Sequence, residues 1–201
     1  MEKLTAYAAA ELTVKKSRFF SELFPCADQA AARAIIKEQK ARYSDAAHVV
    51  HAFVLGANAE IMGMSDDGEP SGTAGRPALD VLKGRQCTDL VLTVTRWFGG
   101  ILLGTGGLVK AYGESAKRVI AAAESAGAFA PIIAEKTFTF TCDYAHYEAV
   151  RRQMERFAVR GLTENFGALV TVRGSIPAEK SPAFARQLTD CSKGAIALGW
   201  Q

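Results

Sequence analysis

The sequence lacks the usual marks of secreted, membrane-spanning and disulfide-bonded proteins. Its four cysteines stand singly, without the CxxC spacing of metal or redox motifs. No apolar run approaches the roughly 20 residues that a membrane helix needs, and the first residues lack the apolar segment of a signal peptide. The formal net charge of +3 is too small to imply nucleic-acid binding by itself. We therefore expect a cytoplasmic protein with no membrane partner.

The length and composition favour a globular protein of two small domains. Hydrophobic residues make up 49% and charged residues 22% of the 201 residues, which is close to the average for globular proteins. The segment 126–131 (AGAFAP) indicates a helix end followed by a linker, because Gly127 suits a left-handed helix end and Pro131 cannot continue a helix. We therefore predict domains at 1–131 and 132–201.

The first domain shows alternating stretches typical of strands and of amphipathic helices. The patterns predict strands at 18–24, 49–55, 60–64 and 91–97, and helices at 32–39, 78–83 and 108–123. Asp28 is a candidate cap for the first helix, because its carboxylate can accept unpaired amide hydrogens there. An α+β fold follows from this mixture.

The second domain has the split β-α-β-β-α-β order of ferredoxin-like folds. The patterns predict strands at 136–142, 159–165, 169–173 and 195–198, and helices at 147–157 and 182–191. In the first strand Phe138, Phe140 and Cys142 alternate with threonines, which indicates a half-buried strand. We expect an antiparallel sheet with both helices on one face.

Three carboxylates lie within four residues at Asp66, Asp67 and Glu69. They could hold magnesium through oxygen ligands, or cap turns and helix ends by accepting backbone hydrogen bonds. The capping interpretation is favoured, since no phosphate-loop lysine accompanies them. The small residues of 71–75 (SGTAG) would let the backbone approach a ligand or another segment closely.

A second glycine-rich loop, Gly104 to Gly107, leads directly into the predicted helix 108–123. Unpaired amides at a helix start, together with the helix dipole, attract anions. Arg76, Arg96 and Lys110 are candidates to assist, because guanidinium groups hold phosphate through paired hydrogen bonds. The loop matches neither standard nucleotide-binding motif, and tight packing under the sheet is an equally good interpretation. Whether the two loops share one groove stays open.

Two histidines and two arginines are further candidates for binding sites. His48 and His51 lie three apart on an expected strand and so point to opposite faces, which is poor geometry for a shared metal; His48 is kept as a candidate pocket residue. Arg152 and Arg156 form a candidate nucleic-acid surface on a helix, although pairing of Glu148 with Arg152 and of Arg151 with Glu155 would make it an ordinary solvated face.

The motifs resemble those of a known family. SDDGEPSGTAGRP (65–77) and RWFGGILLGTGGLVKAYG (96–113), with KKSRFF (15–20) and SDAAH (44–48) before them, look like the signature of the IMPACT/YigZ family. The resemblance implies a first domain like the second domain of a small-subunit ribosomal protein and the GHMP-kinase fold. It also implies a second domain like the last domain of elongation factor G. Eukaryotic members are associated with translational control.

These observations favour a translation-associated regulatory binding protein that contacts RNA or the ribosome through an anion-binding groove. The alternatives are a metal-assisted phosphoryl-transfer or hydrolytic enzyme, with magnesium at the three carboxylates, and a protein-interaction module. The favoured hypothesis assigns no catalytic residue, cofactor or metal, and leaves the oligomeric state open. Its candidate ligand-binding residues are Asp66, Asp67, Glu69, Ser71, Thr73, Arg76, Arg96, Gly104, Thr105, Gly106, Gly107 and Lys110.

Overall fold

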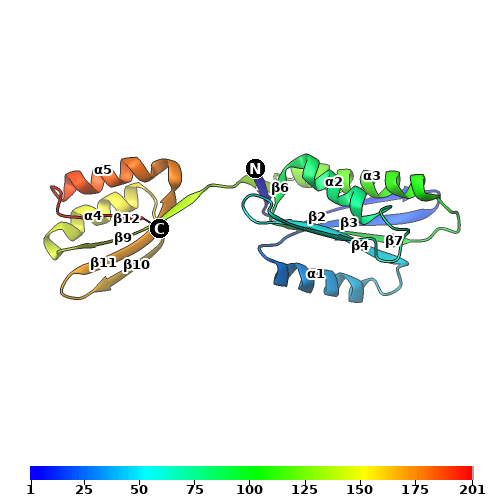
Figure 1. Cartoon of the computed structure of the whole chain (residues 1–201), viewed down its shortest axis with the longest axis horizontal. Coiled ribbons are helices and arrows are strands. Elements are labelled where there is room, and N and C mark those ends of the chain that lie inside the picture. Colours follow the sequence, from blue (N-terminus) through cyan, green and yellow to red (C-terminus); the bar gives the residue numbers. More distant parts are fainter. Residues whose placement is uncertain (201) are drawn as a thin grey trace. The chain divides into compact units, whose positions relative to one another are not determined.

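The chain folds into two units, Met1–Ile132 and Ile133–Gln201. A computed structural model describes residues 1–200. Both units combine helices with mostly antiparallel sheets, which confirms the α+β class (Figure 1). None of the helices in the described part of the chain is both long and apolar enough to cross a membrane.

The first unit is built on a five-stranded antiparallel sheet with the strand order β2-β3-β7-β4-β5. These strands are β2 (Ala8–Val14), β3 (Ser17–Pro25), β4 (His48–Leu55), β5 (Ile61–Ser65) and β7 (Leu90–Trp97). The four strands predicted from alternation are confirmed as β3, β4, β5 and β7, because their residues fit a pleated surface buried on one or both faces. The edge strand β2 had no clear pattern in the sequence.

Three helices cover the two faces of this sheet. They are α1 (Gln29–Arg42), α2 (Gly75–Arg85) and α3 (Thr105–Ser125), with α1 alone on one face and α2 and α3 on the other (Figure 1). Asp28 caps α1, as predicted, by accepting the amide of Ala31 at 2.8 Å. The main core of the unit lies under α2 and α3, whereas α1 buries only Ala32 and Gln39.

A small second sheet corrects the prediction of a linker at 126–131. Its strands β1 (Glu2–Leu4), β6 (Cys87–Thr88) and β8 (Phe129–Pro131) lie in the order β6-β1-β8. Phe129 is paired with Leu4, so the end of this segment is bonded to the start of the chain. Strands of two or three residues are too short to show a period of two, which is why alternation did not predict them.

The second unit has the element order that its sequence patterns predicted. Its elements are β9 (Glu135–Cys142), α4 (Tyr144–Arg156), β10 (Arg160–Phe166), β11 (Val170–Pro177), the short 3₁₀ helix η1 (Ala178–Lys180), α5 (Ser181–Cys191) and β12 (Gly199–Trp200). The antiparallel strand order is β10-β11-β9-β12, and both helices pack on the face that carries Phe138 and Phe140. The closing strand was predicted at 195–198 and lies instead at Gly199–Trp200, because Ile196 is buried from a loop.

Candidate functional site

The two glycine-rich loops line one groove of the first unit. The groove has a volume of about 550 Å³. One side comes from Gly68, Glu69 and Pro70, and the other from residues 102–105 and Leu108 at the start of α3. His48 and Arg96, on the neighbouring strands β4 and β7, complete its polar part. The structure thus answers the question left open by the sequence, since both loops contribute to a single groove.

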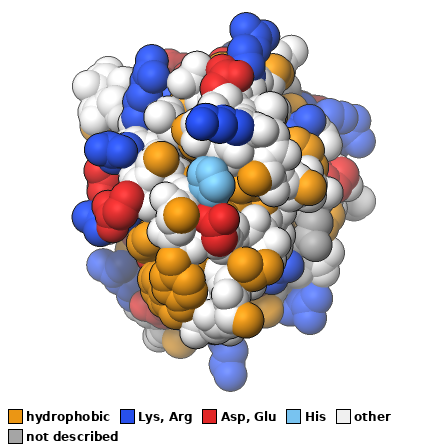
Figure 2. Space-filling view, turned by 90° about the vertical axis from the view of Figure 1, so that its left-hand side faces the viewer, with side chains coloured by type: hydrophobic (Ala, Val, Ile, Leu, Met, Phe, Trp, Pro, Cys, Tyr) orange, Lys and Arg blue, Asp and Glu red, His pale blue; other side chains and the backbone are white. Residues whose placement is uncertain are grey.

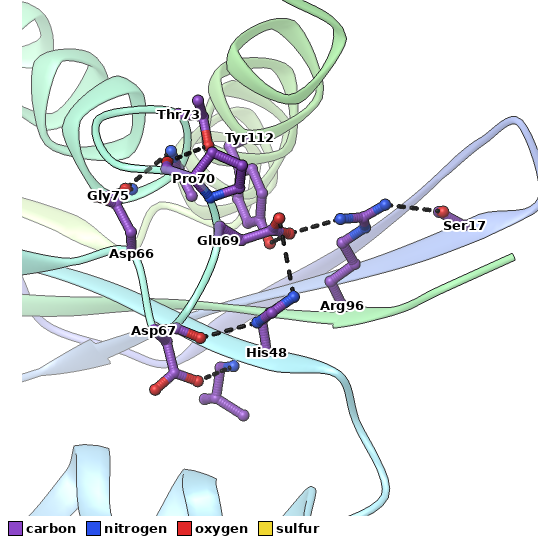
Figure 3. A network of polar contacts seen from close by, with 12 residues as sticks. Ser17, His48, Asp66, Asp67, Glu69, Pro70, Thr73, Gly75, Arg96 and Tyr112 are labelled. Carbon is purple, nitrogen blue, oxygen red and sulfur yellow. Dashed lines mark hydrogen bonds and ion pairs between the residues drawn. The ribbon is translucent and has the colours of Figure 1, made fainter. Parts of the chain in front are cut away.

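Glu69 is the centre of a buried polar network in this groove (Figure 3). Its Oε1 accepts hydrogen bonds from Arg96 Nη1 at 2.6 Å and from the hydroxyl of Tyr112 at 2.7 Å. The Nε2 atom of His48 lies 3.8 Å from its other carboxylate oxygen. Burial, followed by the Glu69 carboxylate, raises the pKa of Tyr112 well above its usual range, so the hydroxyl remains a donor.

Arg96 connects this carboxylate to the neighbouring strand β3. Its side chain rises from β7, is only 6% exposed, and places Nη2 at 3.4 Å from the hydroxyl of Ser17. The guanidinium also lies over the rings of Phe19 and Phe98, at 5.5 and 5.6 Å from their centroids. Within residues 1–200 its Nε has no hydrogen-bond partner. Arg96 is thus held in place mainly by Glu69.

Asp66 acts as a cap for α2, in agreement with the favoured interpretation of the acidic segment. Its carboxylate accepts the amides of Gly72, Ala74 and Gly75 at 2.8, 3.0 and 2.8 Å. Burial opposes ionisation of this group, but the three amide hydrogen bonds lower the pKa of Asp66 below its usual range. This residue therefore fixes the first loop against the helix that follows.

Asp67 fixes the position of His48. Its carboxylate accepts the amide of Val49 at 2.6 Å and pairs with Lys40 of α1, and its backbone carbonyl lies 2.8 Å from His48 Nδ1. A carbonyl only accepts hydrogen bonds, so Nδ1 carries the proton, and Nε2 of the neutral ring is left to accept one. The arrangement can therefore hold a proton-accepting nitrogen toward the groove.

The three carboxylates predicted as a cluster point to different partners. Asp66 binds the start of α2, Asp67 binds β4 and α1, and Glu69 binds Arg96 and Tyr112 (Figure 3). Within residues 1–200, no group of three or more His, Cys, Asp or Glu side chains is arranged to hold a metal ion.

The start of α3 presents free backbone donors at the groove. Gly104 precedes the helix at φ 72°, a conformation that favours glycine, and within residues 1–200 no side chain caps this end. The first turn contains no acidic residue, and Thr105 and Gly106 are exposed. The amides of Thr105, Gly106 and Gly107 are therefore available to an acceptor, in an electrostatic field that favours negative charge. Of these residues Thr105 lines the groove, while Gly107 lines the separate hollow that contains Lys110.

Several predicted site residues lie outside this groove. Arg76 is exposed on α2 and forms a salt bridge with Asp80 at 2.9 Å. Lys110 lines a separate hollow together with Lys15. In the first loop, Ser71 is exposed, and the hydroxyl of Thr73 donates to the carbonyl of Pro70 at 2.6 Å. Of the predicted basic residues, the groove contains Arg96, while Arg76 and Lys110 do not line it.

Sequence reasoning missed Tyr112, the buried partner of Glu69, and the groove residues Phe98 and Leu102. Tyr112 was recognised as part of the inner stripe of a helix, but its partner Glu69 is 43 positions away, and no local pattern reports such a pair. Phe98 and Leu102 are 50% and 82% exposed. The sequence signal that could have identified Phe98 and Leu102 is the presence of large apolar residues beside a glycine-rich loop.

The candidate arginines of the second unit lie on the outer side of α4. Arg152 and Arg156 are exposed. Arg151 forms salt bridges with both acidic neighbours, Glu155 at 3.2 Å and Glu148 at 3.9 Å. The expected Arg151–Glu155 pair is thus confirmed, while Glu148 pairs with Arg151 instead of Arg152. Figure 2, in which this unit faces the viewer, shows basic side chains spread among acidic ones.

The open face of the second sheet is not continuous with these arginines. The core side chains of β9 and β11 pack against α4 and α5, so the alternating threonines point to the opposite face. That face contains a hollow lined by Thr139, Thr171 and Arg173, among others. Arg152 and Arg156 on α4 therefore do not lie on the open face of the second sheet.

Comparison with known proteins places both units in one family. Residues 15–120 match the model of the Impact N-terminal domain, and residues 140–195 match a domain of unknown function, DUF1949. An IMPACT family member of Haemophilus influenzae is 37% identical over 191 residues, covering 94% of this chain and 90% of the relative. The chain belongs to the IMPACT family. A second member, YigZ of Escherichia coli, is 35% identical and covers 92% of this chain and 90% of its own.

A solved structure agrees with this membership. A protein described only as hypothetical aligns with a TM-score of 0.73 and 32% identity, over 98% of this chain and 95% of its own. The two-unit α+β arrangement is therefore shared with a relative of known structure. The residues that line the groove lie between Ala47 and Leu108. They all belong to the part of this IMPACT family member that matches the Impact N-terminal domain.

Proposed function

We propose that the chain is a translation-associated regulatory binding protein whose groove takes a phosphate of RNA or of the ribosome. The observation that carries the proposal is the uncapped start of α3, which opens into the same groove as His48 and Arg96. A phosphate placed there would accept the amides of Thr105 to Gly107 and gain from the dipole of a 21-residue helix.

The charges around the groove support an anion at the helix end rather than at its centre. Glu69 already compensates Arg96 at 2.6 Å, so the guanidinium contributes little net positive charge. The remaining attraction comes from the unpaired amides and the dipole at the start of α3. The apolar wall, with Phe98 half exposed, suits an unstacked base beside that phosphate. Single-stranded RNA presents both groups together.

Family membership supports the link to translation. Members of the family in eukaryotes are associated with translational control, and this chain carries the family motif in both loops of the groove. The likeness of the two units to the GHMP-kinase fold and to the last domain of elongation factor G stays a prediction. In this proposal Arg152 and Arg156 add a separate, salt-sensitive contact on α4.

The proposal is tested by a charge placed at the start of α3. A Cβ added at Gly106 meets open space, and the position lies inside the first helical turn, so Gly106→Asp should keep or raise thermal stability. The new carboxylate would occupy the amides and repel phosphate, and we expect binding of a fluorescent single-stranded RNA or of ribosomes to fall at least about tenfold.

Gly106→Asn is the matched control, because it has the same shape without the charge. It should bind RNA within about twofold of the unchanged protein, since its neutral side chain does not repel phosphate. Equal binding by the Asp and Asn variants would show that no anion sits at this helix start. If RNA and ribosomes fail to bind the unchanged chain across a range of salt concentrations, the proposed function itself is wrong.

A further inference from the structure

A row of polar side chains crosses the other face of the five-stranded sheet, beneath α1. Glu22 of β3 lies opposite Thr93 of β7, and Thr93 lies opposite His51 of β4. Residues in register on neighbouring strands point to the same face, with Cβ atoms about 5 Å apart. Glu22 and Thr93 are fully buried. Thr95, two residues further along β7, points to the same face and is also fully buried.

Five buried polar atoms in this layer have no hydrogen-bond partner within residues 1–200. They are Glu22 Oε2, Gln39 Oε1, His51 Nδ1, Thr93 Oγ1 and Thr95 Oγ1. Gln39 enters from α1 and is 2% exposed, so it faces the sheet from above. Buried polar atoms are almost always paired, and each unpaired one costs free energy. Five such atoms in one layer indicate partners that are not protein groups.

The chemistry of the layer selects the kind of partner. Glu22 already accepts the hydroxyl of Tyr7 at 2.8 Å, interacts with the hydroxyl of Tyr43 and lies 3.8 Å from Arg42, so charge balance requires no further cation. An anion would leave the carboxylate and amide oxygens unpaired and would be repelled by Glu22. Water both donates and accepts, which satisfies the acceptor oxygens and the two hydroxyls together.

We propose that the layer between α1 and the sheet is a binding site for a cluster of internal water molecules. The waters bridge Glu22, Thr93 and His51 across three strands and join them to Gln39 of α1. A helix attached through water and few apolar contacts opens at lower cost than one attached through a dry core. The α1 helix is therefore the first of the three helices of this unit to detach from the sheet.

The hydroxyls of Thr93 and Thr95 provide a test, because their removal should lower stability if the layer holds water and should not lower it if the layer is dry. If Thr93 and Thr95 hold water, Thr93→Val and Thr95→Val each remove a hydrogen bond, and the unfolding equilibrium constant should rise about fivefold. If the layer is dry, the same changes replace an unpaired hydroxyl with a methyl group, and the variants should be as stable as the unchanged chain or more stable. That result would overturn the proposal.

Thr88→Val is the matched positive control for this assay. Thr88 is also fully buried, and its hydroxyl donates to the carbonyl of Gly56 at 2.8 Å. Its replacement should raise the unfolding equilibrium constant about fivefold whether or not α1 covers water.

A crystal structure of the unchanged chain decides the question without any variant. Ordered water within hydrogen-bond distance of Thr93 Oγ1 and Glu22 Oε2 is expected, and a dry contact at both atoms would overturn the proposal. Native-state hydrogen exchange tests the consequence: amides of α1 should exchange through openings of lower free energy than those of α3. Equal opening free energies would contradict early detachment of α1.

Discussion

The two faces of the five-stranded sheet are built from alternate residues of the same strands, and they are sealed in different ways. Under α2 and α3 lies the main core, in which α3 alone buries eight residues. Under α1 the apolar cluster is small, with Cys26, Ala32, Leu55 and Val91 as its buried members. A strand buried on both faces can therefore serve two different kinds of contact.

The polar groups show the same contrast. On the α3 face, Glu69 holds Arg96 and Tyr112, and the hydroxyls of Ser21 and Ser115 lie 2.5 Å apart, while Arg96 Nε has no partner within residues 1–200. On the α1 face, the five atoms named above have no protein partner among the described residues. A paired network in a dry core stabilises one arrangement, whereas unpaired groups call for solvent. The groove thus opens from the rigid face of the sheet, and the weakly attached helix covers the other.

The largest expected difference between the faces concerns two neighbouring phenylalanines of β3. Phe19 is fully buried on the α3 face against Tyr112, while Phe20 is half-buried on the α1 face beside Tyr43. Phe19→Ala should lower the free energy of unfolding by about 3 to 5 kcal/mol, the usual cost of truncating a core phenylalanine. Phe20→Ala should cost less than half as much in urea denaturation. Similar losses for the two variants would show that both faces are equally well packed.

A smaller effect is expected from the carboxylate at the centre of the paired network. Glu69→Gln keeps the shape but removes the charge that holds Arg96, and should cost about 1.5 to 3 kcal/mol, the range for a hydrogen bond to a charged group. Tyr112→Phe, which deletes one neutral donor, should cost about 1 kcal/mol. Both free-energy changes can be measured by urea denaturation followed by Trp97 fluorescence. A Trp200→Phe background removes the other tryptophan, so the signal reports unfolding of the first unit alone. A cost for Glu69→Gln no larger than that for Tyr112→Phe would mean that Arg96 does not depend on the charge.

Local patterns in the sequence predicted most elements, because alternation and helical spacing report burial directly. The strands β3, β4, β5 and β7 and the helix α3 followed from such patterns. The β1-β6-β8 sheet did not, since its strands are too short to repeat and their pairing joins residues as distant as Lys3 and Ala130. Pairing between distant short segments is set by tertiary packing, which one sequence does not display.

The groove was predictable in part, for a related reason. Glycine loops and a helix start are local features, so Gly104 to Gly107 and the capping role of Asp66 could be inferred from the residues. Which cations face the groove depends on the rotation of each helix and on side-chain partners. Arg76 lies one turn from Asp80 and pairs with it, whereas Arg96 is drawn inward by a carboxylate 27 positions away.

The smallest expected effect is a pH dependence that belongs to the α1 face. Burial first, and then the positive charge of Lys40, lower the pKa of His51, and Asp67 opposes them in part. In the unfolded chain this histidine titrates near its usual value of about 6.5. As the pH falls below that value, the unfolded chain binds a proton that the folded chain resists, so the free energy of unfolding decreases. The contribution of His51 is thus present above about pH 6.5 and is lost as the pH falls toward the folded pKa.

Substitution can show that the pH dependence of unfolding arises from His51 on the α1 face and not from residues of the groove. Urea denaturation between pH 7 and 5, followed by Trp97 in the Trp200→Phe background, should show a loss of stability that His51→Leu reduces. His146→Gln, in the second unit, should leave that slope unchanged. Asp66, whose pKa is lowered by amide hydrogen bonds, acts only below its usual value of about 3.9 and so does not enter this window. A slope that survives in His51→Leu would place the titrating group elsewhere and would remove the pH dependence from the α1 face.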